Sequence, residues 1–273
     1  MINIIDTDKL FQQFATEYVK KNAVNLTAEE IEENIELIFT AFANTTFSEL
    51  DGLSPVKYYD SFSADELALA LIEHLNSGIA PSAYLCESLA EKEGGEEIIA
   101  GLLNENDEEK ISYAINLLND KGSKNYLDKY LDFILNSTYS SVVELSTEAL
   151  ISNAEMVKER VLDAYGIAKL DRKINLVEIL SYVKDDERAF KILIDEFNAN
   201  PDKMMIYASY LSRYGDERAI EVLTLAISSD KIDYADYQEL KCAIESLGGE
   251  VDIKKDFSKD KAFLSVKNFK IEN

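Results

Sequence analysis

The chain has 273 residues, 47% of them hydrophobic and 29% charged, with only three prolines and ten glycines, which excludes a disordered or loop-rich chain. Its formal net charge is −24, and residues 1 to 120 hold 6 lysines against 24 acidic residues, a net charge of −18 for that part. Such a surface repels polyanions, so we expect neither nucleic acid nor a membrane as partner; the acidity either serves a basic protein partner or only maintains solubility.

Residues 1–80 are predicted to form an N-terminal helical region that opens with two helices, over 6–22 and 27–44. The second begins with Thr27 and Glu30, which are spaced as a capping box. Its apolar positions recur at helical spacing and predict one buried face. These positions are Ile31, Ile35, Ile38 and Phe42.

A third helix is expected over 63–78, where Ser63 and Glu66 form another capping-box pattern and Gly78 supplies a C-terminal stop. Its apolar face consists of Leu67, Leu71 and Leu75. The preceding stretch, 45–62, is the one long irregular segment. Its turn residues make it the best candidate for a break in the chain.

From residue 81 to 252 the pattern predicts an array of about five helix pairs followed by a final helix. The second helices of the pairs start 27, 32, 32 and 30 residues apart, and each follows another helix of similar length. These starting positions are Gly95, Gly122, Ala154, Asp186 and Asp216. Residues 253–273 then form a separate basic segment.

The array resembles the HEAT-like repeat proteins, through Asp-Asp-Glu-Arg-Ala at 185–189 and Gly-Asp-Glu-Arg-Ala at 215–219. The three earlier pairs share the period but lack this signature. The layout is also similar to a group of bacterial HEAT-repeat proteins with no assigned activity. The resemblance implies an all-α fold, a right-handed α-solenoid of helical hairpins of about 30 residues, with the N-terminal helical region before it.

Most of the repeated signature has a structural explanation. Gly215 can adopt a left-handed conformation that ends one helix, and Asp216 can cap the next. Glu217 favours the positive end of the helix dipole, and Ala219 permits close helix packing. The apolar positions after Ala219, which are Ile220, Leu223 and Ile227, are predicted to be buried.

Arginine is confined to residues 160–218, where all five arginines of the chain occur. The guanidinium groups of Arg188 and Arg218 have two explanations: they pair with acidic residues of neighbouring repeats, or they bind an acidic peptide. In the second case Arg160 and Arg213 belong to the same binding surface.

Tyr207, Tyr210 and Tyr214 lie at helical spacing on one predicted helix. Their rings either fill core positions, with the hydroxyl groups at the edge, or form a recognition surface together with the arginines. The sequence leaves both alternatives open, because it does not tell which side of a helix pair faces inward.

Catalytic and metal-binding patterns are scarce. His74 is the only histidine and is predicted to lie on a helix surface, so we expect no metal site and no cofactor. Cys86 and Cys242 are far apart, which favours two buried thiols over a disulfide or a zinc site. The absence of a signal-peptide pattern and of any run of about 18 apolar residues predicts a cytoplasmic location.

The basic C-terminal segment is predicted to fold back as a cap on the last helices, because the end of a repeat array needs such protection. The function expected for the whole chain is a non-enzymatic scaffold that binds a protein or peptide in the superhelical groove. Two alternatives stay open: a lyase-like HEAT protein or enzyme accessory that binds a small ligand, and a structural module of a larger assembly. The sequence does not predict an oligomeric state.

Overall fold

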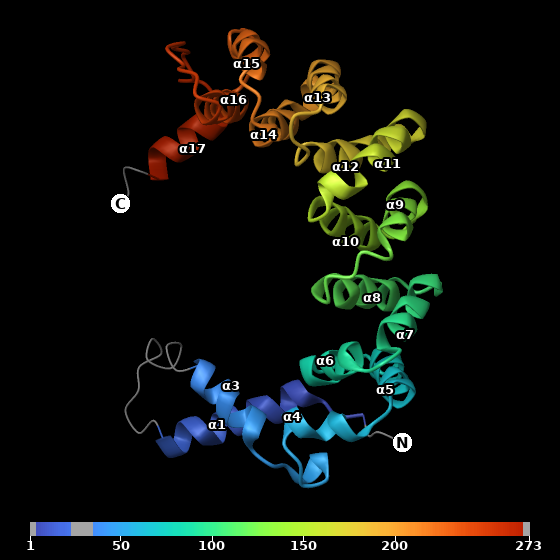
Figure 1. Cartoon of the computed structure of the whole chain (residues 1–273). Coiled ribbons are helices and arrows are strands. Elements are labelled where there is room, and N and C mark those ends of the chain that lie inside the picture. The colour runs from blue at the N-terminus through green and yellow to red at the C-terminus, as the bar shows by residue number, and fades with distance from the viewer. Residues whose placement is uncertain (1–3, 23–34, 270–273) are drawn as a thin grey trace. The chain divides into compact units, whose positions relative to one another are not determined.

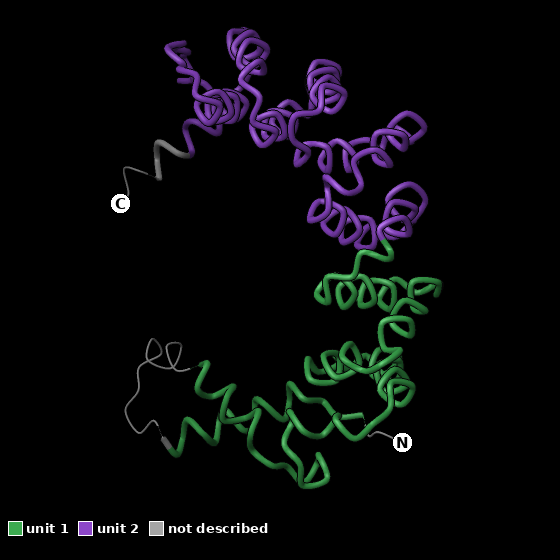
Figure 2. Tube along the Cα trace, viewed as in Figure 1, with its two compact units in different colours: residues 1–126 green, residues 127–273 purple. Residues whose placement is uncertain are grey.

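The computed structural model describes residues 4–22 and 35–269, and helices are its regular elements (Figure 1). The all-α prediction is confirmed, since the described ranges contain no β-strand and only an isolated bridge between Phe47 and Leu53. None of the described helices has the length and apolar content that crossing a bilayer requires. The chain divides into two compact units, residues 1–126 and 127–273, at a boundary inside the predicted array (Figure 2).

Unit 1 consists of α-helices joined by short 3₁₀ turns. The α-helices are α1 (Thr7–Asn22), α3 (Ile35–Asn44), α4 (Pro55–Tyr58), α5 (Ala64–Asn76), α6 (Ala83–Glu91), α7 (Gly95–Gly101) and α8 (Glu108–Asp120). The 3₁₀ turns are η1 (Ser48–Leu50), η2 (Tyr59–Ser61) and η3 (Leu102–Asn104).

Local sequence patterns predict several ends and faces of these helices correctly. The capping box at α5 is present, with Ser63 N donating to Glu66 Oε2 at 2.9 Å and Glu66 N donating to Ser63 Oγ at 3.3 Å. Gly78 has a left-handed φ of 65° just after α5. The predicted face of α3 buries Ile38 and Phe42 but leaves Ile35 exposed. Its predicted capping box, together with Ile31, lies outside the described residues.

The segment 45–62 is a packed connection, although its sequence suggested a break. Asp51 and Gly52 form a turn with φ values of 53° and 77°, which brings Phe47 N to 3.0 Å from Leu53 O. The aromatic rings of Tyr58 and Tyr59 follow this turn and are 2% and 1% exposed. Burial of these two rings holds the connection against unit 1.

The prediction that His74 lies on a helix surface is wrong, because the side chain is 0% exposed. Its Nδ1 lies 2.7 Å from Ala70 O, and its Nε2 accepts a hydrogen bond from Ile5 N at 3.2 Å. These two bonds require the tautomer with the proton on Nδ1. The imidazole therefore ties the segment before α1 to α5, a contact between residues 69 positions apart that helical spacing cannot reveal.

Unit 2 contains two rows of helices and a C-terminal segment (Figure 1). The first row is α10 (Ser140–Ile151), α12 (Leu170–Leu180), α14 (Met204–Tyr214) and α16 (Tyr234–Ser246). The second row is α9 (Leu127–Asn136), α11 (Ala154–Ile167), α13 (Glu187–Ala199) and α15 (Ala219–Ile227). The remaining elements are η4 (Pro201–Lys203) and α17 (Lys261–Phe269).

The closest hairpins in unit 2 are offset by one helix from the predicted pairs. Packing is most extensive between α9 and α10, α11 and α12, α13 and α14, and α15 and α16. Neighbouring first-row helices also pack on one another. A repeat period gives the spacing of the helices but does not decide which of two successive connections closes the tighter hairpin.

The repeated signature forms the predicted turn in two variants. Gly215 has a φ of 84°, and Asp185, at the equivalent position, has a φ of 54°. Asp186 caps α13, since its Oδ1 accepts from Arg188 N at 2.9 Å. The predicted cap on α15 is displaced: Asp216 accepts from Arg218 N at 2.9 Å, but the α-helix begins at Ala219 after a tight turn.

Residues after α16 return to that helix. Tyr237 Oη donates to Ile253 O at 2.6 Å, and the Phe257 ring lies 5.4 Å from the Tyr234 ring and 5.2 Å from the Tyr237 ring. Val251 and Ile253 pack against the core of unit 2. The segment thus covers α16 mainly through apolar and aromatic contacts.

We expect His74→Ala to lower the free energy of unfolding by about 1–3 kcal/mol, because it leaves buried backbone groups without their partner. Urea unfolding measures this loss, and hydrogen exchange should become faster in residues 5–22. Glu73→Ala, at an exposed position of the same helix, is the control and should have little effect. Equal stability of the two variants would contradict the structural role of His74.

Two glycine substitutions should have opposite effects. Gly215→Ala places a side chain at a positive φ and should lower the free energy of unfolding by about 1 kcal/mol. Gly166→Ala, inside α11 with nothing within 4 Å of the new Cβ, should raise it by up to about 1 kcal/mol. Thermal unfolding measures both, and a gain in stability for Gly215→Ala would refute the left-handed turn.

Candidate functional site

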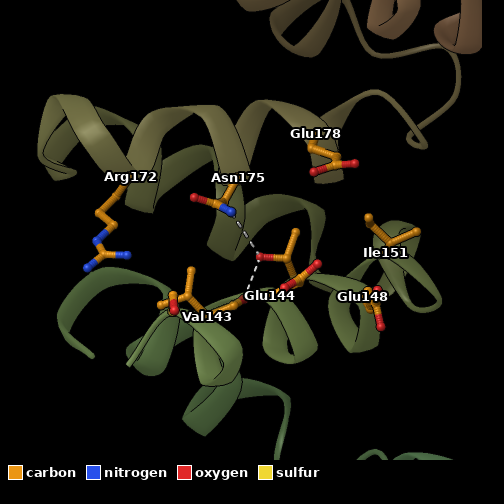
Figure 3. Close-up of a pocket in the computed structure, with 9 residues that line it drawn as sticks. Val143, Glu144, Glu148, Ile151, Arg172, Asn175 and Glu178 are labelled. Carbon is orange, nitrogen blue, oxygen red and sulfur yellow. Dashed lines mark hydrogen bonds between the residues drawn. The ribbon is translucent and has the colours of Figure 1, made fainter. Parts of the chain in front are cut away.

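A groove of about 420 Å³ lies between α10 and α12 in unit 2 (Figure 3). Its walls belong to two neighbouring helices of the first row, and its lining combines apolar, amide and charged side chains. The residues that line it are Ser140, Val143, Glu144, Thr147, Glu148, Ile151, Arg172, Asn175 and Glu178.

The α10 wall follows from helical periodicity. Positions 140, 143, 144, 147, 148 and 151 share one face, because residues three or four apart in a helix are neighbours. The carboxylates of Glu144 and Glu148 are exposed on this face, while the opposite face buries Val142 and Leu150. The core thus orients α10 so that its two carboxylates rim the groove.

A short hydrogen-bond chain crosses the floor of the groove between the two helices. Asn175 Nδ2 on α12 donates to Thr147 Oγ1 at 3.4 Å, and Thr147 Oγ1 donates to Val143 O at 2.8 Å (Figure 3). Thr147 is 3% exposed, so its hydroxyl is held by the core side of α10. These bonds position the Asn175 amide in the lining.

The charges in the groove are separated along its length. Arg172 lies at one end, and Glu148 and Glu178 lie at the other (Figure 3). Arg172 Nη2 donates to Ser137 O at 2.7 Å, which anchors the guanidinium near the connection between α9 and α10. A bound molecule would therefore meet a cation at one end and carboxylates at the other.

Glu178 also interacts with the neighbouring helix α14. Its Oε1 lies 3.9 Å from Arg213 Nη1. Burial raises the pKa of the Tyr210 hydroxyl above its usual range, and the negative charge of Glu178 raises it further. Arg213 and Tyr210, both predicted binding residues, thus contact a groove residue without lining the groove themselves.

The lining offers groups for noncovalent binding. The amide of Asn175 can donate and accept hydrogen bonds, the guanidinium of Arg172 donates, and the carboxylate of Glu148 accepts. Among residues 4–22 and 35–269, no group of three or more His, Cys, Asp or Glu side chains is placed to hold a metal ion.

The predicted binding residue Arg188 pairs with carboxylates on two helices. Its Nη1 and Nη2 donate to the two oxygens of Glu159 on α11, at 2.8 and 2.7 Å, in a bidentate arrangement. Its Nη2 also donates to Asp186 Oδ2 at 2.7 Å. Hydrogen bonding to Arg188 lowers the pKa of Asp186 well below its usual range, against the opposing effect of desolvation.

Arg218 repeats this arrangement one helix later. It donates to both oxygens of Glu187 on α13, at 3.1 and 2.8 Å, and to Asp216 Oδ2 at 2.6 Å. Its guanidinium also lies 4.4 Å from the centre of the Phe190 ring. Both arginines therefore make the contacts between repeats that the first alternative predicted.

Arg160 extends the same series toward α9. Its Nη1 forms an ion pair with Asp128, 32 positions earlier in the chain. Three successive second-row contacts, α9 to α11, α11 to α13 and α13 to α15, thus each contain an arginine–carboxylate pair. We call the three pairs, Asp128–Arg160, Glu159–Arg188 and Glu187–Arg218, the arginine ladder.

The predicted tyrosines belong to the interior of unit 2. Tyr207 and Tyr210 are 2% and 7% exposed and belong to its hydrophobic core. Burial raises the pKa of Tyr207 to about 12, and the nearby charge of Glu196 contributes to the rise. Tyr214 Oη donates to Asp186 O at 2.9 Å. The core alternative therefore describes these rings, and burial removes Tyr207 and Tyr210 from a recognition surface.

The groove residues were not predicted as a binding site. Arg172 was noticed only as a member of the arginine cluster, and Glu144, Glu148 and Asn175 were not singled out. A polar face on a helix that is apolar elsewhere was available as an indication. The juxtaposition of α10 with α12, however, requires the tertiary structure.

The prediction of two buried thiols is half correct. Cys86 is buried, and desolvation raises the pKa of its thiol to about 11, whereas Cys242 is exposed. Cys242 lies on α16 between positions that face solvent, Gln238 and Glu245. Its apolar neighbours Ala243 and Ile244 occupy the buried face of that helix instead.

Comparison with known proteins adds no relative to this description. A scan against protein-family models finds no match, and a search of curated proteins finds none either.

The lowered pKa of Asp186 predicts a pH dependence of stability. The folded state retains the charged carboxylate more strongly than the unfolded chain, whose Asp pKa is near 3.8. The stabilisation is present above that value and is lost as the pH falls toward the folded-state pKa. Between about pH 5 and pH 2, the free energy of unfolding should therefore decline more steeply in wild type than in Asp186→Asn.

Urea unfolding at each pH measures these slopes. Asp230→Asn, at an exposed aspartate, is the matched control and should keep the wild-type slope. If Asp186→Asn keeps that slope as well, the ion pair with Arg188 does not contribute to stability.

Proposed function

We propose that this chain is a non-enzymatic scaffold that binds a segment of another protein in the groove between α10 and α12. The observation that carries the proposal is the separation of charge in this groove, with Arg172 at one end, Glu148 and Glu178 at the other, and the Asn175 amide between them (Figure 3).

A polypeptide fits this lining chemically. A side-chain amide can donate to a peptide carbonyl and accept from a peptide N–H at the same time, and Asn175 is positioned for this by Thr147. The guanidinium of Arg172 suits a carbonyl or carboxylate oxygen. The two exposed carboxylates of α10, Glu144 and Glu148, suit a lysine or arginine side chain.

The proposal includes a finer description of the fold, a right-handed α-solenoid of HEAT-like hairpins over residues 81–252. Its support comes from the recurring helix starts in the sequence and from the two rows of helices in unit 2. The arginine ladder adds support, because its pairs join residues 29 to 32 positions apart. In repeat proteins, such nearest-neighbour contacts stabilise a stack that presents an extended binding surface.

Photo-crosslinking in cells tests the binding role. A photoreactive residue in place of Glu144 should crosslink to a polypeptide, whereas the same residue in place of Glu221, exposed on α15, should not. Adding Asn175→Ala to the Glu144 variant should reduce the crosslinked fraction about ten-fold, because it removes the amide that meets the peptide backbone.

Thermal unfolding of each variant controls for folding. Equal crosslinking from positions 144 and 221, or no effect of Asn175→Ala, would contradict the proposal. A small molecule that co-purifies with wild type and is lost in Asn175→Ala would favour the alternative of a ligand-binding enzyme or accessory.

A further inference from the structure

Helix α6 in unit 1 has a cavity on each of two sides. The cavity toward α8 has a volume of about 740 Å³, and the cavity toward α1 and α3 has a volume of about 510 Å³. Ala83 and Glu87 line both cavities, and both residues are exposed. The two cavities therefore adjoin across the exposed side of α6, and we call the combined surface the α6 groove.

The walls of the α6 groove are largely apolar and aromatic. Toward α1 and α3, the Phe11 and Phe39 rings stack with centres 4.3 Å apart, and Phe39 remains 49% exposed. Toward α8, the wall includes Tyr113 and the buried, neutral thiol of Cys86. An exposed aromatic surface beside a cavity is a typical feature of interaction sites.

The rim of the α6 groove is acidic. Four exposed carboxylates line it, those of Asp8, Glu87, Glu91 and Asp120. The single lysine in the lining, Lys121, is engaged within the protein, since its Nζ donates to Ala90 O at 2.6 Å and lies 3.7 Å from Glu96 Oε2. The charges of the rim thus await cations from outside.

The acidity of unit 1 as a whole reinforces this charge. Residues 1–126 hold 8 lysines against 24 acidic residues and therefore account for −16 of the total charge of −24. A negative potential of this kind attracts basic partners and speeds their association.

We infer that the α6 groove binds a basic amphipathic peptide segment, whose apolar side chains enter the two cavities while its lysine or arginine side chains meet the carboxylates of the rim. The two cavities flank one helix, so a single segment that crosses α6 can place an anchor in each. A small molecule would occupy one cavity and leave the aromatic wall of the other uncovered.

This site goes beyond the proposed function, because it belongs to the other unit and has a different chemistry. The basic C-terminal segment of the same chain is not its occupant in this structure, since Ile253 and Phe257 lie on α16. The inference and the function proposed for the α10–α12 groove can therefore fail separately.

Fluorescence anisotropy with the full chain tests the inference. The probe is a labelled helical peptide of about 16 residues, with leucine at helical spacing and lysine elsewhere, at about 0.15 M salt. One control peptide has serine in place of leucine, and another has glutamate in place of lysine. We expect binding of the leucine–lysine peptide to be at least about ten-fold tighter than that of either control.

Variants locate the bound probe on the chain. Ala83→Trp should weaken binding at least about ten-fold, because its indole would fill the space shared by the two cavities. Asn104→Trp, at an exposed position outside both cavities, is the matched control and should bind normally.

A second pair of variants changes charge without adding bulk. Glu87→Gln with Asp120→Asn should weaken binding about five-fold, since two rim charges are lost. Glu73→Gln with Glu105→Gln removes the same charge from exposed positions outside the groove and should have less effect. This pair keeps the test decisive if the tryptophan variant fails to fold.

Several outcomes would overturn the inference. These are equal binding of either control peptide, equal effects of the groove variants and their matched controls, and the absence of binding by wild type. Native mass spectrometry covers the other occupants: a small molecule displaced by Ala83→Trp, or a dimer that this substitution dissociates, would assign the groove to a ligand or to a second copy of the chain.

Discussion

The burial of one apolar face on each short helix is the constraint on which the rest of the structure depends. The helices of unit 2 that carry the groove and the arginine ladder have 9 to 14 residues, and helices of that length are marginal in water by themselves. They persist because each covers the apolar face of its neighbours. The recurrence of this packing about every 30 residues explains why cap, small residue and arginine recur at the same spacing.

This constraint also explains why the most conspicuous residues of the sequence are not at the candidate site. The arginine ladder connects second-row helices, and Tyr207 and Tyr210 fill the core between rows. These groups were attractive as binding residues because arginine and tyrosine are frequent in interfaces. In this protein their hydrogen bonds are directed toward the next repeat, so the groups left for a partner are less conspicuous ones.

The two grooves share a plan although they belong to different units. Each lies beside a helix that is the first of a predicted pair, α6 in unit 1 and α10 in unit 2, and each presents carboxylates around an apolar floor. They differ in their cations. Arg172 gives the α10–α12 groove a positive end, whereas Lys121 beside α6 is neutralised by Glu96. The first groove therefore suits a segment with charges of both signs, and the second a purely basic one.

Sequence alone determined the features that depend on neighbouring residues in the chain. The capping box at Ser63, the left-handed Gly215 and the buried Leu67, Leu71 and Leu75 follow from local geometry and helical spacing. The tertiary structure decided where His74 and Cys242 lie, how residues 45–62 pack, and which faces of α10 and α12 meet. Those features depend on contacts between residues distant in the chain, and periodicity shows that a helix has a buried face without showing which helix will cover it.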